Sequence, residues 1–151
     1  MKFIKLDHRD AIESERIRRV LFDAYSIEAQ LIDIADFPPL RRSADHIRHA
    51  QSTFFGCIHE SELVAVAEIE REAAQQATIA SFVVHPTRFR RGIGSQLLRH
   101  VLELLGNTLV TVSTASKNKP AIALYAKHGF QLSNTWLIGP QIEMVTLSKR
   151  Q

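Results

Sequence analysis

A chain of 151 residues, of which 45% are hydrophobic, is long enough to fold as one domain around an ordinary core. No stretch approaches the roughly 18 apolar residues that a spanning helix needs, and the N-terminus lacks the apolar region of a secretory signal. We therefore expect one domain over residues 1–151, in the cytoplasm and without a membrane partner. The single cysteine, Cys57, excludes an internal disulfide, and we expect no metal site.

The net charge of +3 is divided unevenly along the chain. Residues 1–72 carry −4, whereas residues 73–142 carry +6. This asymmetry indicates that the C-terminal half meets an anion. Nucleic acid is one such anion, but the sequence has neither interleaved aromatic and basic residues nor a recognition helix, so we expect no nucleic-acid partner.

Hydrophobic periodicity predicts the elements of the first half of the chain. Ile17, Val20, Leu21, Ala24 and Tyr25 follow the spacing of one apolar helix face. Ser43 is suited to cap a second, short helix. The predicted strands of this half are 3–6, 53–59, 63–70 and 79–84.

In the second half, the pattern predicts helices over 92–105 and 120–128 and strands over 108–113, 130–137 and 141–147. Gly106 suits the end of the first of these helices, and Pro120 suits the first position of the second. A turn at 138–140 separates the last two strands. The order of elements predicts an α+β fold of the α/β-sandwich type, in which helices cover the faces of a sheet.

The junction between the strand at 79–84 and the helix at 92–105 has the features of a phosphate-binding turn. A helix N-terminus presents unpaired amides and a positive dipole end, which attract phosphate. Gly92 and Gly94 allow close approach to the backbone, Arg90 and Arg91 add positive charge, and Ser95 can donate its hydroxyl or cap the helix. The dinucleotide-binding G-x-G-x-x-G pattern lacks its third glycine, and the G-x-x-x-x-G-K-[ST] pattern is absent. A glycine turn without a ligand is the remaining alternative.

Two motifs then resemble the GNAT superfamily of acyl-CoA-dependent N-acyltransferases. The first, Q/R-x-x-G-x-G/A after a strand ending in V-x-P, is matched by Val84 to Pro86 and by Phe89 to Gly94, although Phe89 replaces the usual glutamine or arginine. The second is N-x-x-A-x-x-L-Y followed by G-F. It is matched by Asn118, Ala121, Leu124, Tyr125, Gly129 and Phe130.

The resemblance implies a mixed, mostly antiparallel sheet of about seven strands flanked by about four helices. It implies transfer of an acetyl group from acetyl-CoA to a primary amine by direct attack in a ternary complex. It also implies that the backbone of Phe82 and Val84 pairs with the pantetheine arm as an added strand would. The residues implied to bind this cosubstrate are Phe82, Val83, Val84, Phe89, Arg90, Arg91, Gly92, Ile93, Gly94, Ser95, Asn118, Ala121 and Tyr125.

For catalysis, the resemblance favours Tyr125 as the general acid that protonates the departing thiolate, while the pattern alone equally allows a core tyrosine. Asn118 can bind the cosubstrate or cap its own helix. The candidates for the general base are Glu68, Glu70 and His85. An oxyanion contact from the Val84 amide and simple proximity can contribute to the rate as well.

The acceptor is expected against the acidic N-terminal half, where Glu28, Asp33 and Asp36 would suit a cationic amine. A domain that binds acyl-CoA without turnover, as a sensor or a subunit, is the alternative function. The final strands over 130–147 can pair with a second copy, so a homodimer is a further expectation from the resemblance.

Overall fold

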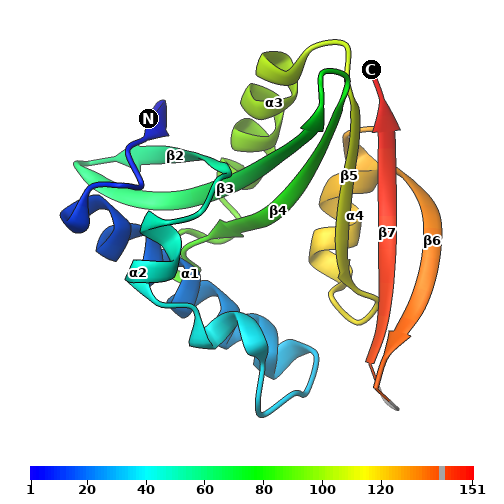
Figure 1. Ribbon diagram of the computed structural model, residues 1–151. Coiled ribbons are helices and arrows are strands. Elements are labelled where there is room, and N and C mark those ends of the chain that lie inside the picture. The colour runs from blue at the N-terminus through cyan, green and yellow to red at the C-terminus, as the bar shows by residue number, and fades with distance from the viewer. Residues whose placement is uncertain (140–141) are drawn as a thin grey trace.

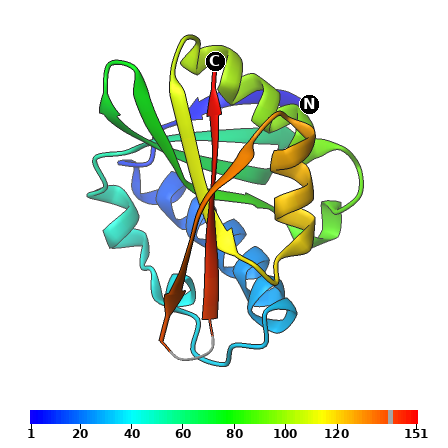
Figure 2. The same cartoon turned by 90° about the vertical axis from the view of Figure 1, so that its right-hand side faces the viewer.

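The chain forms one seven-stranded sheet with helices on both of its faces (Figures 1 and 2). The computed structural model describes residues 1–139 and 142–151. This architecture confirms the predicted α+β sandwich and its mixed, mostly antiparallel sheet. The elements, in chain order, are β1 Lys2–Leu6, α1 Ala11–Leu31, a 3₁₀ turn Pro38–Arg41, α2 Ala44–Arg48, β2 Thr53–His59, β3 Glu62–Ala73, β4 Gln76–Val84, a 3₁₀ turn Pro86–Arg88, α3 Ile93–Leu105, β5 Leu109–Ala115, α4 Lys119–Lys127, β6 Gln131–Ile138 and β7 Ile142–Arg150.

The strand order is β1-β2-β3-β4-β5-β7-β6, and the pair β4–β5 is parallel while the other pairs are antiparallel. The β4–β5 pairing joins Gln76–Ile79 to Leu109–Val112, and within the described residues it goes no further. β4 nevertheless runs on to Val84 and β5 to Ala115, so the two strands diverge, as Figure 1 shows. We call residues 80–84 the free edge of β4. Their backbone groups on the β5 side are left open to an added strand.

Each face of the sheet has its own apolar core. On one face, α1 and α2 pack against β2, β3 and β4 through residues that include Ile17, Leu21 and Ile47. On the other face, α3 and α4 pack through residues that include Leu97, Val101 and Tyr125. Since strand side chains alternate between faces, β4 sends Val83 to the first core and Phe82 to the second.

The caps predicted from the sequence are present. Ser43 accepts a hydrogen bond from the His46 amide at the start of α2, and Gly106 follows the end of α3 with a φ of 58°. Asp10 caps α1 in the same way as Ser43 caps α2, by accepting from the Glu13 amide.

The hairpin of β3 and β4 is longer than its sequence pattern predicts. β3 continues to Ala73 and β4 begins at Gln76, where exposed polar residues hide the strand alternation. Backbone pairing between the two strands extends the hairpin to its tip, although the side-chain pattern there does not indicate strands. Of the predicted turn and last strand, Pro140 and Gln141 lie outside the described residues, and β7 is described from Ile142.

The sheet ends at β6, whose apolar side chains Leu132 and Leu137 are more than 60% exposed. This edge is available for the homodimer suggested by the sequence, which stays a prediction. In the described residues, no helix combines the length and the apolar character that crossing a bilayer requires.

Candidate active site

The turn between β4 and α3 leaves a run of amides without partners. Within residues 1–139 and 142–151, the amides of residues 90–95 donate no hydrogen bond to another residue. Arg90 and Gly92 have φ values of 63° and 76°, so the backbone is left-handed at both positions. Gly92 adopts this conformation without steric cost. Residues 89–92 are exposed. The turn therefore presents its amides, at the dipole end of α3, to an anion from solvent.

Gly94 lies where this turn meets β4 and α4. A Cβ atom added there would stand 3.4 Å from Val84 Cγ2 and 3.6 Å from Leu124 Cδ2. The position tolerates little more than a methyl group beside the backbone. A larger side chain at Gly94 would therefore crowd the end of β4.

Tyr125 follows Leu124 on α4 and is 4% exposed. Its ring packs against Phe82 of the free edge and against Phe130, with centroid distances of 6.1 and 5.6 Å. Burial, with smaller effects of Tyr25 and Glu28, raises the pKa of Tyr125 well above its usual range. The phenol therefore keeps its proton at neutral pH. Tyr125 is thus a core residue whose protonated ring packs on Phe82 of the free edge, and its role as an acid stays a prediction.

Asn118 connects two layers of the fold. Its Oδ1 accepts from the Ala121 amide at 3.3 Å and so caps α4, while its Nδ2 donates to Glu28 Oε1 of α1 at 2.7 Å. Of the two roles that the sequence left open for Asn118, the cap of α4 is therefore present. The predicted contact of Asn118 with a cosubstrate stays a prediction, as does that of Ala121 beside it.

Ser95 hydrogen-bonds to His128, which follows α4, with 2.9 Å between Oγ and Nε2. Burial lowers the pKa of His128, and Arg99, Lys127 and Lys149 lower it further, so the ring is neutral at pH 7. A neutral Nε2 can accept the Ser95 proton. The Ser95 hydroxyl is thus held by the residue that follows α4, beside the turn between β4 and α3.

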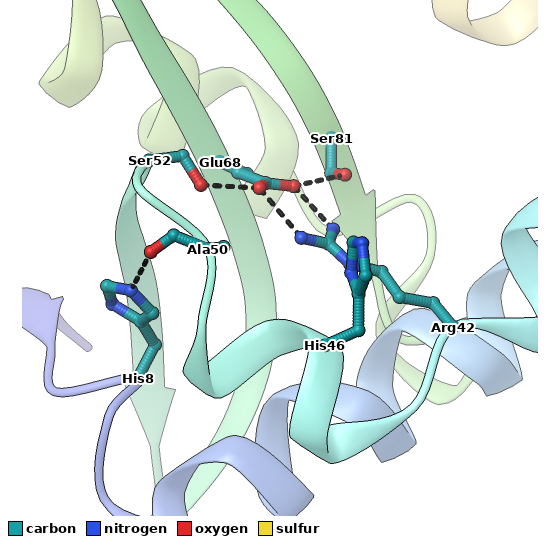
Figure 3. A network of polar contacts seen from close by, with 7 residues as sticks. All are labelled: His8, Arg42, His46, Ala50, Ser52, Glu68 and Ser81. Carbon is teal, nitrogen blue, oxygen red and sulfur yellow. Dashed lines mark hydrogen bonds and ion pairs between the residues drawn. The ribbon is translucent and has the colours of Figure 1, made fainter.

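Glu68, the first base candidate, lies buried in the network of Figure 3. Arg42 donates to its two oxygens at 2.6 and 2.9 Å, and Ser52 and Ser81 donate at 2.5 and 2.9 Å. Burial raises the pKa of Glu68, but these donors outweigh it, and the pKa lies below 4.5. With every lone pair engaged and a low pKa, Glu68 is suited to holding the strands β3 and β4 in place.

The other two base candidates lie elsewhere. Glu70 is exposed near the end of β3, beside a shallow hollow of about 300 Å³ that Arg42, Ser52 and Glu68 also line. His85 has its Nε2 2.8 Å from Asp23 Oδ2 and its Nδ1 2.9 Å from Thr87 Oγ1. Both ring nitrogens of His85 are therefore engaged with protein groups. Their assignment as bases stays a prediction.

Sequence reasoning placed Tyr25 on the apolar face of a helix and gave it no role at the site. Its ring is half-buried beside Phe37. Burial is the main cause that raises the pKa of Tyr25 to about 12, and Ser81, on the α1 side of β4, lies close enough to lower it in part. No local pattern distinguishes such a residue from a core tyrosine, because its polar neighbours come from distant segments.

The acidic residues expected to meet the acceptor separate in the structure. Asp36 forms an exposed ion pair with Arg41 at 2.7 Å, and Asp33 follows α1 with a left-handed φ of 59°. Glu28 instead accepts a hydrogen bond from Asn118 at the start of α4. Among the described residues, no group of three or more His, Cys, Asp or Glu side chains is placed to hold a metal ion.

Two features define the class of the protein: β4 and β5 diverge, and the turn after β4 has amides without partners at residues 90–95. The model of the acetyltransferase (GNAT) family matches residues 15–130, most of the chain, and the chain therefore belongs to this family. Over 131 residues it is 33% identical to the UPF0157 protein YqkA of Bacillus subtilis (strain 168). This match covers 86% of the chain but 38% of YqkA, so the chain spans well under half the length of that relative.

Solved structures show the same fold at low sequence identity. The PaiA N-acetyltransferase of Thermoplasma acidophilum, in complex with coenzyme A, aligns with a TM-score of 0.81 at 16% identity, over 99% of this chain and 98% of that chain. The ribosomal-protein-S18-alanine N-acetyltransferase of Escherichia coli gives 0.77 at 18%, over 99% and 92%. An aminoglycoside 6'-N-acetyltransferase complexed with coenzyme A gives 0.76 at 10%, over 99% and 97%.

Proposed function

We propose that the protein transfers an acetyl group from acetyl-CoA to a primary amine of a small molecule or peptide, by direct attack in a ternary complex. The observation that carries the proposal is the run of unpaired amides at residues 90–95, which continues into the free edge of β4. Family membership and neighbours crystallised with coenzyme A support it. We also propose that the protein is located in the cytoplasm, because a pool of acyl-CoA is available there.

Each part of the proposed site has a role that follows from its geometry. The amides of the turn bind the pyrophosphate, and the free edge binds the pantetheine arm through ladder hydrogen bonds. The bound cosubstrate supplies an activated acyl group as a thioester. Tyr125, protonated and packed on Phe82, gives its proton to the departing sulfur. The partners in this proposal are an amine and, through β6, a second copy of the chain, with neither nucleic acid nor membrane.

Calorimetry with acetyl-CoA tests the binding half of the proposal, and release of free thiol with a panel of amines tests the transfer half. We expect the Tyr125→Phe variant to bind acetyl-CoA as the wild type does and to lose on the order of 10²-fold in kcat. Equal thiol release by the two proteins would identify Tyr125 as a core residue only. Absence of acetyl-CoA binding by the folded wild type would refute the proposed function itself.

A further inference from the structure

Glu28 lies in the C-terminal part of α1 at a junction between the two helical layers. The Asn118 amide that donates to Oε1 is itself fixed, because its other end caps α4. The hydrogen bond of 2.7 Å therefore ties α1, on one face of the sheet, to the start of α4, on the other. This junction spans the region where β4 and β5 have separated, and Figure 2 shows the end of α1 beside the start of α4.

The carboxylate of Glu28 has unused capacity that the carboxylate of Glu68 lacks. In the part of the chain that the structure describes, Glu28 Oε2 accepts no hydrogen bond and Glu28 forms no ion pair, whereas Glu68 is engaged through both oxygens. Glu28 is nonetheless half-buried. A carboxylate that is partly withdrawn from water and has no cation beside it is stabilised by a positively charged ligand.

Two tyrosines lie on opposite sides of β4 near its free edge. Tyr25 lies toward Ser81 on the α1 side of β4, and Tyr125 packs on Phe82 on the α4 side. The negative charge of Glu28 raises the pKa of both phenols, after the larger effect of burial. The hydrogen bond from Asn118 places Glu28 at the start of α4, the helix that carries Tyr125.

We propose that Glu28 binds the ammonium group of the acceptor and, as general base, takes the proton that the amine must lose before it attacks. The inference rests on the proposed function and names the acceptor class of that site, a primary amine that arrives as a cation. Glu28 takes the place for which the sequence offered Glu68, Glu70 and His85.

The proton balance of the step is complete. The free oxygen of Glu28 accepts one proton from the ammonium, which leaves a neutral amine and a carboxylic acid that later releases the proton to solvent. The nitrogen lone pair then forms the C–N bond at the acyl carbon, and the C–S bond breaks. Tyr125 gives its proton to the sulfur, and the second proton of the attacking nitrogen restores the phenol. The products are the amide and the free thiol.

The environment of Glu28 suits a base. Burial is the main cause that raises the pKa of Glu28 above 4.5, and the hydrogen bond from Asn118 opposes it. Among the described residues, the titratable groups on which its charge acts are Tyr25, on its own helix, and Tyr125, on α4. Arg42 and Glu68 also act on Tyr25. A carboxylate whose pKa moves toward neutrality is the better proton acceptor at pH 7.

The test compares the wild type with Glu28→Gln and with a control, Glu103→Gln, at an exposed position on α3. The probes are acetyl-CoA and three amines, namely propylamine, kanamycin and a peptide with an N-terminal alanine. We expect Glu28→Gln to keep the Kd for acetyl-CoA within about twofold and to lose about 10²-fold or more in kcat/KM. We expect Glu103→Gln to match the wild type in both measurements.

The pH profile separates a base from a structural residue. In the wild type, we expect kcat/KM to rise with pH as Glu28 ionises, above pH 4.5. In Glu28→Gln, kcat/KM should rise only as the free amine loses its own proton, and therefore near the pKa of each amine. Glu28→Asp, which keeps the charge, should recover part of the activity if the glutamine variant unfolds. Wild-type rates or an unchanged profile in Glu28→Gln would overturn the inference, as would loss of acetyl-CoA binding in a folded Glu28→Gln. A wild type that binds acetyl-CoA but acetylates none of the probes overturns it as well, while failure of the wild type to bind refutes the proposed function.

Discussion

Replacing Arg42 with methionine tests the interpretation of Glu68 as a structural residue. Methionine retains an apolar stem beside the Phe54 ring, over which the guanidinium lies at 5.5 Å, but removes both charged donors to Glu68. Glu68 would then be buried, at 2% exposure, with the two serines as its donors. Leaving one partner of a buried pair uncompensated costs roughly 3–5 kcal/mol. Since the Arg42 side chain is 19% exposed, we expect about 3 kcal/mol, at the lower end of that range.

For a chain of 151 residues, a loss of about 3 kcal/mol corresponds to a fall of about 6–12 °C in Tm. Thermal and urea unfolding of Arg42→Met measure it, and the double variant Arg42→Met/Glu68→Gln, which removes the stranded charge, should recover much of the loss. A cost below about 1 kcal/mol, typical of a surface pair, would refute the structural interpretation. So would a Glu68→Gln single variant that keeps its stability but loses its activity, because that result would make Glu68 the base.

The same pair predicts a dependence of stability on pH. The pKa of Glu68 is lower in the folded protein than its ordinary value of 4.5, so its contribution is complete above that value and is lost as the pH falls through the folded-state pKa. The remaining predictions concern the phosphate-binding turn. Gly94→Val should weaken acetyl-CoA binding at least tenfold by calorimetry, because a Cβ there already contacts Val84 at 3.4 Å and the branches would crowd the end of β4; binding within twofold of the wild type would contradict it. His128→Asn should flatten the pH dependence of unfolding below pH 6.5, since the lowered pKa of His128 means that folding favours its neutral form and that stability falls as the pH drops through that range. Equal slopes for the two proteins would show that the His128 ring does not titrate differently on folding.

Local patterns were enough to locate the glycine-bearing turn before α3 and the helix that carries Tyr125. Glycine spacing, a strand that ends at proline and an apolar stripe are all written within some twenty residues, and their physical causes act over the same short range. The sequence also offered a cap of α4 as one of two roles for Asn118, and the structure contains this cap, since a cap and its amide are three residues apart. Boundaries were less accurate where polar residues form strands, as at the tip of the β3–β4 hairpin.

The sequence by itself therefore determined the class of fold, the place of the turn and the phenol beside it. Tertiary structure alone decided which carboxylate is free and which is engaged, because those partners lie far apart in the chain. Arg42 and Glu68 are separated by 26 residues, and Glu28 and Asn118 by 90. The pKa of a carboxylate depends on the burial and the donors that packing brings to it, and no spacing along the chain encodes these.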